Sequence, residues 1–214
     1  NDSSGTGTLL GFATFPKETD SSVRNDIYNN NFDILARNAE FENIIQNDTT
    51  RSELLSKRNA MNQIAKYTAS MDLIKNLQEE ANSTSDTGPI DYIIGNTTSM
   101  NAISSNSTSW NRIWNNKDDG AGYQYFLNQI RNDKMAIGKY VSGWNYLTNS
   151  GDPPSNFNDM DDVAANSSTM ENITQDSNLM DLIVTSEKAI KSIANDGTAL
   201  DALSSSMSSD SNII

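Results

Sequence analysis

The sequence of residues 166–206 reads NSSTMENITQ, DSNLMDLIVT, SEKAIKSIAN and DGTALDALSSS when it is divided every ten residues. The fifth and eighth residues of each segment are apolar, which gives the pairs Met170/Ile173, Met180/Ile183, Ile190/Ile193 and Leu200/Leu203. The same spacing recurs in NTTSMNAISS and NSTSWNRIWN, which begin at Asn96 and Asn106, and again across residues 41–74. An internal repeat at a fixed period is therefore the main structural signal in this chain.

A period of ten residues is incompatible with a continuous amphipathic helix. An α-helix turns by about 100° per residue, so ten residues fall about 80° short of three full turns. An unbroken helix would carry the apolar pairs around its axis and bury no single face. A strand fails as well, because residues three apart point to opposite faces of a sheet, whereas on a helix they share a face. The pattern predicts a short helix that stops and restarts in every repeat.

Helix-capping residues stand at the expected places. Four residues before the first apolar position lie Asn96, Asn106, Asn166, Asp176, Ser186 and Asp196. These residue types accept hydrogen bonds from the free N–H groups of a helix N-terminus. Helices this short are unstable alone, so neighbouring repeats must bury a shared apolar seam. The prediction is an all-α, solenoid-like stack of short helices; the alternative is a conventional helical bundle.

The pattern divides the chain into seven segments. They are an extended N-terminal segment (1–20), a first helical repeat block (21–80), a loop (81–89), a second repeat block (90–116), an aromatic-rich irregular insert (117–158), a third repeat block (159–206) and a C-terminal tail (207–214).

Aromatic residues gather in and just before the insert. They are Trp110, Trp114, Tyr123, Tyr125, Phe126, Tyr140, Trp144 and Tyr146. Aromatic side chains are enriched at protein interfaces, and an insert in a repeat protein often makes its contacts. We therefore treat these eight residues as a candidate interface. The alternative interpretation is that they thicken the core.

Composition excludes several classes of function. The 214 residues carry a net charge of −13 and contain no Cys and no His. Zinc sites built from Cys and His and histidine-based acid–base catalysis are therefore excluded. The acidic balance argues against nucleic acid and anionic membranes as partners, and no apolar run approaches the ~18 residues of a membrane span.

Motifs of catalysis and ligand binding do not occur in the sequence. There is no phosphate-binding or dinucleotide-binding glycine motif and no G-x-S-x-G. The acidic clusters at 118–119 and 159–162 do not match the alternating spacing of a calcium loop. We predict no catalytic residue, no cofactor and no metal site, and expect the protein not to be an enzyme.

Segments such as NTTSMNAISSNSTSW and NSSTMENITQDSNLM resemble degenerate tandem repeats in structural proteins of tailed bacteriophages, of the tail-fibre and head-fibre type. The resemblance implies a virion surface component that contacts other virion proteins or a host receptor, and a homo-oligomer is expected. An alternative is a bacterial or archaeal cell-surface filament or adhesin subunit. A third hypothesis, a carbohydrate-active module, rests on the aromatic insert and nearby acidic residues.

Overall fold

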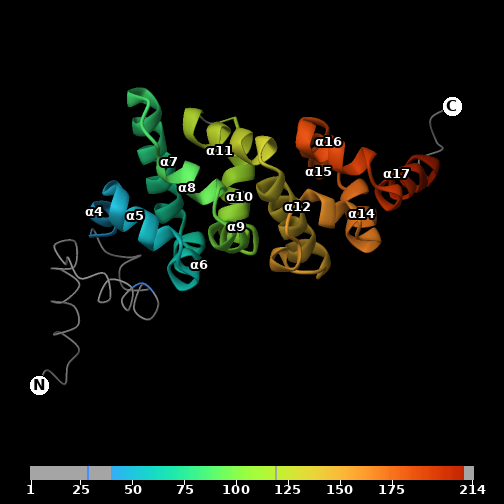
Figure 1. Ribbon diagram of the computed structural model, residues 1–214, viewed down its shortest axis with the longest axis horizontal. Coiled ribbons are helices and arrows are strands. Elements are labelled where there is room, and N and C mark those ends of the chain that lie inside the picture. Colours follow the sequence, from blue (N-terminus) through green and yellow to red (C-terminus); the bar gives the residue numbers. More distant parts are fainter. Residues whose placement is uncertain (1–27, 29–39, 119, 210–214) are drawn as a thin grey trace, which may run out of the picture. The chain divides into compact units, whose positions relative to one another are not determined.

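The computed structural model describes residue 28, residues 40–118 and residues 120–209 (Figure 1). Every regular element in these ranges is helical, which confirms the all-α prediction. The predicted N-terminal segment 1–20 and residues 210–214 of the predicted tail lie outside the described residues. The chain divides into two compact units, Asn1–Ser99 (unit 1) and Met100–Ile214 (unit 2), and the boundary falls inside one helix.

The helices of the two units follow one another with short connections. Unit 1 holds α4 (Glu40–Gln46), α5 (Asp48–Leu55), α6 (Arg58–Lys66), α7 (Thr68–Thr84) and α8 (Pro89–Ile94). The boundary lies in α9 (Thr97–Ser104). Unit 2 continues with α10 (Ser107–Asn115), α11 (Gly120–Asn132), α12 (Lys134–Asn149), the 3-10 helix η2 (Pro154–Asn156), α13 (Met160–Ala164), α14 (Ser167–Thr174), α15 (Ser177–Val184), α16 (Glu187–Ala194) and α17 (Gly197–Ser209).

The stop-and-restart prediction is confirmed in the third repeat block. Helices α14 to α17 begin at intervals of ten residues. The residue before α14, α15 and α16 has an extended backbone in each case, for example φ −102° and ψ 109° at Asp176, so the chain changes direction there. The last helix, α17, extends to Ser209 and so includes the first three residues of the predicted tail.

All six predicted caps accept hydrogen bonds from backbone amides at the start of their helices. Asn96 accepts from Ser99, Asn106 from Thr108, Asn166 from Thr169, Asp176 from Asn178 and Leu179, Ser186 from Ala189, and Asp196 from Thr198 and Ala199. A cap of this kind contributes about 1 kcal/mol. Local chemistry therefore fixes where these helices begin.

Some helices pack against the helix three places later in the chain. In unit 2, α13 packs against α16 and α14 against α17; in unit 1, α4 packs against α7 and α5 against α8. Consecutive helices, such as α14, α15 and α16, also contact each other. The helices do not form a uniform solenoid, because three longer helices interrupt the ten-residue series. These are α7 with 17 residues, α11 with 13 and α12 with 16.

The apolar positions of the repeat form the core. The first and second apolar positions of most units are fully buried, as at Met61/Ile64, Met100/Ile103, Met160/Val163 and Met170/Ile173. Burying such side chains contributes about 1.5–3 kcal/mol each. Short helices that are unstable alone are therefore held by their neighbours.

Two segments predicted to lie outside the repeat helices are partly helical. The insert 117–158 departs from the repeat, but it contains the long helices α11 and α12 and is not irregular. In α12 the pairs Ile137/Val141 and Tyr140/Trp144 are four residues apart, which suits one continuous helix. The predicted loop 81–89 is shortened, because α7 continues to Thr84 and α8 begins at Pro89.

Close packing around α12 depends on two glycines. A Cβ on Gly138 would lie 2.4 Å from the carbonyl carbon of Asp159, and one on Gly143 would lie 2.3 Å from the carbonyl oxygen of Ser104. Only a residue without a side chain fits at distances this short. The start of α13 and the end of α9 can therefore approach α12 directly.

Candidate functional site

The predicted aromatic residues form a stacked cluster inside unit 2. The Trp110 ring stacks on Tyr140, with centroids 4.7 Å apart and planes at 10°, and on Trp144 at 4.3 Å. Trp110 Nε1 donates to the Tyr140 carbonyl at 3.0 Å, and the Tyr140 hydroxyl donates to the Trp110 carbonyl at 3.1 Å. The stacking and the reciprocal hydrogen bonds join α10 to α12.

Most of this cluster is core. Trp110, Trp114, Tyr123, Phe126 and Tyr140 are buried. Because a buried side chain offers no surface to a partner, the interface prediction does not hold for these five residues in the folded chain. It remains a prediction for Tyr125 and Trp144, which are half-buried, and for Tyr146, which is exposed. Reading the cluster as a thickened core fits the five buried residues.

Trp144 links this cluster to the repeat helices. Its Nε1 donates to the Asp176 carboxylate at 2.6 Å, while the other oxygen of that carboxylate caps α15. A hydrogen bond to a charged acceptor contributes about 1.5–3 kcal/mol. Asp176 therefore holds α12 and α15 together in addition to capping a helix.

Lys139 is a buried cation that the sequence analysis did not single out. Its Nζ donates to the carbonyls of Pro154, at 2.8 Å, and Phe157. Burial lowers the pKa of Lys139, and the nearby carboxylates of Asp162 and Asp159 partly oppose that shift. A lowered amine pKa can indicate a catalytic lysine. Here the Lys139 residue is 1% exposed and its ammonium group is bonded to two backbone carbonyls, which is the arrangement of a structural anchor.

A cavity of about 670 Å³ lies in unit 1 between α5, α7, the connection 85–88 and α8. Its polar lining includes Asp48, Arg51, Glu80, Asp86, Thr87 and Tyr92. The volume is in the range of about 300–1,000 Å³ found for small-molecule sites, but such sites are mostly apolar. Most of the residues that line this cavity are polar or charged.

Arg51 forms the main contacts at this cavity. The side chain is buried, and its guanidinium forms an ion pair with Asp48 and donates to the carbonyls of Thr87, at 3.0 Å, and Ile45, at 3.4 Å. The guanidinium carbon also lies 5.1 Å from the centre of the Tyr92 ring, within cation–π range. The cation is thus held by the carboxylate and carbonyls around it, although its Nε has no hydrogen-bond partner.

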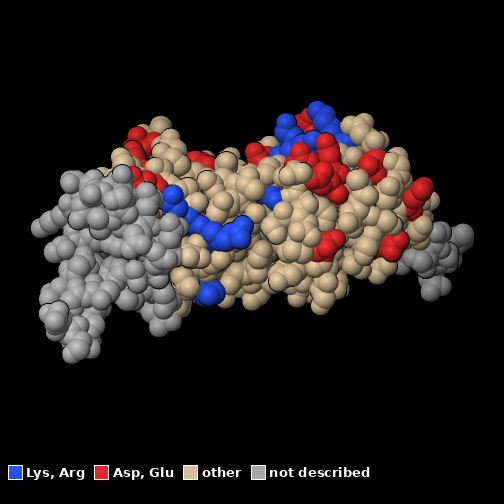
Figure 2. Space-filling view, turned by 60° about the horizontal axis from the view of Figure 1, so that its bottom comes forward, with Lys and Arg blue, Asp and Glu red and all other residues tan. Residues whose placement is uncertain are grey.

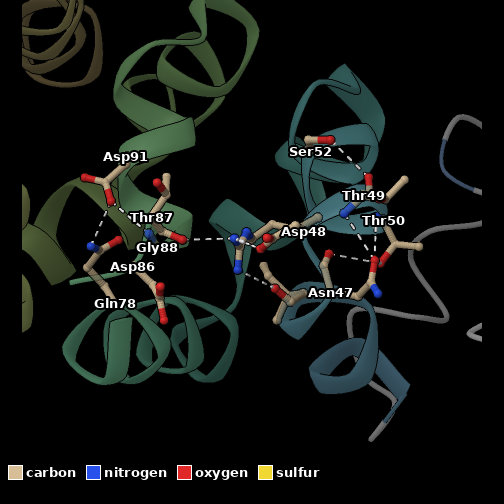
Figure 3. A network of polar contacts seen from close by, with 12 residues as sticks. Asn47, Asp48, Thr49, Thr50, Ser52, Gln78, Asp86, Thr87, Gly88 and Asp91 are labelled. Carbon is tan, nitrogen blue, oxygen red and sulfur yellow. Dashed lines mark hydrogen bonds and ion pairs between the residues drawn. The ribbon is translucent and has the colours of Figure 1, made fainter. Parts of the chain in front are cut away.

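A second group of contacts fixes the same connection (Figure 3). Gln78 donates to Asp91 at 3.0 Å and accepts from the Ile90 amide at 2.9 Å, and Asp91 accepts from the Gly88 amide at 2.8 Å. A Cβ on Gly88 would lie 2.2 Å from the Gln78 Oε1. A side chain at residue 88 would therefore clash with the Gln78 side chain in its present position. Both groups of contacts hold residues 85–88 against the helices, and we assign the cavity residues a structural role.

The described residues contain neither a candidate metal site nor a candidate membrane-spanning helix. No group of three or more Asp or Glu there could hold a metal ion, and no described helix is both long and apolar enough to cross a membrane. On the face shown in Figure 2, acidic side chains are scattered over the C-terminal helices and do not form one patch. Comparison with models of protein families, with curated proteins and with solved structures found no match.

Proposed function

We propose that this protein is a non-enzymatic structural component of a phage virion, in a tail fibre, a head fibre or another surface-exposed position. The observation that supports the proposal is the series of capped helices that restarts every ten residues from Ser167 to Ser209. Proteins built from such small units stabilise each unit on its neighbours and are suited to scaffolding. The resemblance of the repeats to those of tailed-phage structural proteins supports a location in the virion.

In this role the protein acts through contacts with other proteins. The proposed partners are further virion structural proteins, further copies of the same chain and a host-surface receptor. The net charge of −13 keeps such a surface soluble and disfavours contact with nucleic acid. Tyr146 offers an exposed aromatic side chain for a receptor contact.

Mass spectrometry of gradient-purified source material tests this location. We expect the chain at a fixed ratio to capsid and tail proteins, and its copy number per particle then separates a head fibre from a tail fibre. Recovery in a cell-envelope or filament fraction that lacks capsid protein would refute the virion role. That result would favour a cell-surface filament or adhesin subunit.

A further inference from the structure

The connection between α12 and η2 contains the one aspartate–proline peptide bond of the chain, Asp152–Pro153. The other prolines follow Phe15, Gly88 and Pro153. An aspartate–proline bond is the peptide bond that acid breaks most easily, because the aspartate side chain reaches its own carbonyl carbon and the proline nitrogen is a comparatively basic leaving group. The sequence therefore marks one position in the chain as a candidate cleavage site.

The structure leaves the peptide group of this bond without hydrogen bonds. Pro153 has no N–H to donate, and the Asp152 carbonyl accepts no hydrogen bond from any residue that the structure describes. In a helix, each interior carbonyl accepts a hydrogen bond that is lost when its carbon becomes tetrahedral. The Asp152 carbonyl has no such bond to lose, and its residue is exposed, so water reaches it.

The chain on both sides of this bond is held in place. Before the bond, the Gly151 amide donates to the Asn145 carbonyl at 3.3 Å. After it, the Asn156 amide donates to the Pro153 carbonyl at 2.9 Å. The Asn156 side chain also donates to Oδ1 of Asp152 at 3.3 Å, while Oδ2 accepts no hydrogen bond from the described residues. One carboxyl oxygen is thus available to react without the unfolding of any helix.

We propose that the Asp152–Pro153 bond is a self-cleavage site that reacts in the folded protein under acidic conditions. A carboxyl oxygen of the protonated Asp152 side chain attacks the backbone carbonyl carbon of the same residue. The carboxyl proton passes to the Pro153 nitrogen, and the C–N bond breaks. This leaves a cyclic anhydride at residue 152 and a free secondary amine at residue 153. One water molecule then opens the anhydride, so the net reaction is hydrolysis and nothing is oxidised or reduced.

The two fragments should remain associated after the cut. Fragment 1–152 contains α12, which packs against η2, α13, α14 and α16 of fragment 153–214. The buried Lys139 of the first fragment donates to the carbonyls of Pro154 and Phe157 in the second. These contacts cross the cut, and none of them uses the broken bond. Cleavage therefore gives a folded unit 2 with two new chain ends at its surface.

Intact-mass spectrometry of the full chain tests the site. The protein is incubated at the lowest pH at which circular dichroism shows full helicity. We expect fragments 1–152 and 153–214, whose masses add up to the intact mass plus one water. Pro153→Ala has a poorer leaving group and Asp152→Ser lacks the nucleophile, so both should stay intact. The control Asp86→Ser removes an exposed aspartate that no proline follows and should be cut like the wild type. An uncut wild type overturns the proposal, and so does cleavage of either site variant at the wild-type rate.

A second comparison shows whether the folded protein reacts. A bond that broke only in unfolded molecules would be slowed by the folding equilibrium constant, which is at least about 10³ for a stable domain. We expect the folded chain to be cut less than about a hundredfold more slowly than the chain in guanidinium chloride at the same pH, because opening this connection unfolds no helix. A larger difference overturns the proposal.

Size-exclusion chromatography tests the association of the fragments. The nicked protein should elute as one species at the volume of the intact chain and separate into two only in guanidinium chloride. Separation in native buffer would contradict the contacts of α12 across the cut. The cleavage and the virion role can fail separately, because cleavage is measured on the isolated chain and the location is measured in particles.

Discussion

Replacing Gly138 by alanine should destabilise unit 2, although the same change stabilises an ordinary helix. A Cβ at this position would lie 2.4 Å from the carbonyl carbon of Asp159 and 2.5 Å from the amide nitrogen of Met160. Favourable contacts between carbon atoms begin at about 3.5 Å, so the start of α13 must move away from α12 by roughly 1 Å.

The expected loss follows from two opposing effects. Alanine is favoured over glycine inside a helix by about 1 kcal/mol. Overpacking a well-packed site costs about 1–3 kcal/mol, and we take the upper end because the contacted atoms are backbone and cannot rotate away. The net loss is then about 2 kcal/mol, which lowers the melting temperature by roughly 4–8 °C in a protein of this size.

Urea unfolding followed by far-ultraviolet circular dichroism measures the effect. The matched control is Gly197→Ala at the start of α17, where a Cβ meets nothing within 4 Å. The control should be unchanged or up to about 1 kcal/mol more stable. If Gly138→Ala is as stable as the wild type and equally helical, the close approach of α12 and α13 is wrong.

Three further predictions concern hydrogen bonds and ionisation. Asp176→Ala should cost about 1–2 kcal/mol more than Asn106→Ala in urea unfolding, because Asp176 accepts from an indole N–H as well as capping its helix; equal losses would contradict that double role. Burial raises the pKa of Tyr140, so its contribution to stability is complete below the ordinary tyrosine pKa of about 10 and falls by up to about 1.4 kcal/mol per pH unit above it. Urea unfolding between about pH 9 and 11 should show a shallower decline for Tyr140→Phe than for the wild type, and parallel curves would count against this explanation. The hydrogen bond from the Lys134 ammonium lowers the pKa of Asp161, so stability from this pair is present above the ordinary carboxyl pKa and lost as the pH falls through the lowered value. An NMR titration should show that Lys134→Met raises the pKa of Asp161, and an unchanged pKa would exclude the ion pair in solution.

Local features of the fold could be predicted from the sequence. Caps such as Asn166 and Ser186 and core positions such as Ile173 follow from the repeat, because capping and helix faces depend on residues within one turn. The partner of each helix could not be predicted, since nothing in a ten-residue unit says which other helix it packs against. The long helix α12 does not follow from the ten-residue period, although its apolar residues four apart indicate a helix.

The candidate site was harder to predict than the fold. The concentration of aromatic residues was visible, but their burial depends on how α10, α11 and α12 meet. The roles of Arg51 and Lys139 could not be predicted from the sequence, because their side chains bind backbone carbonyls of distant segments. Arg51 binds the carbonyl of Thr87, and Lys139 binds that of Pro154. Every residue has a carbonyl group, so no sequence pattern marks such an acceptor.

The interval of three helices also affects how the chain folds as it is synthesised. α14 and α17 begin thirty residues apart, and closing a chain segment of that length costs little more entropy than closing a shorter one. Contacts at such modest separation favour rapid folding. A helix of eight residues such as α14 is unstable alone, so it gains its main partner only once α17 has been made. A premature stop codon before Gly197 therefore destabilises α14, which begins thirty residues upstream at Ser167.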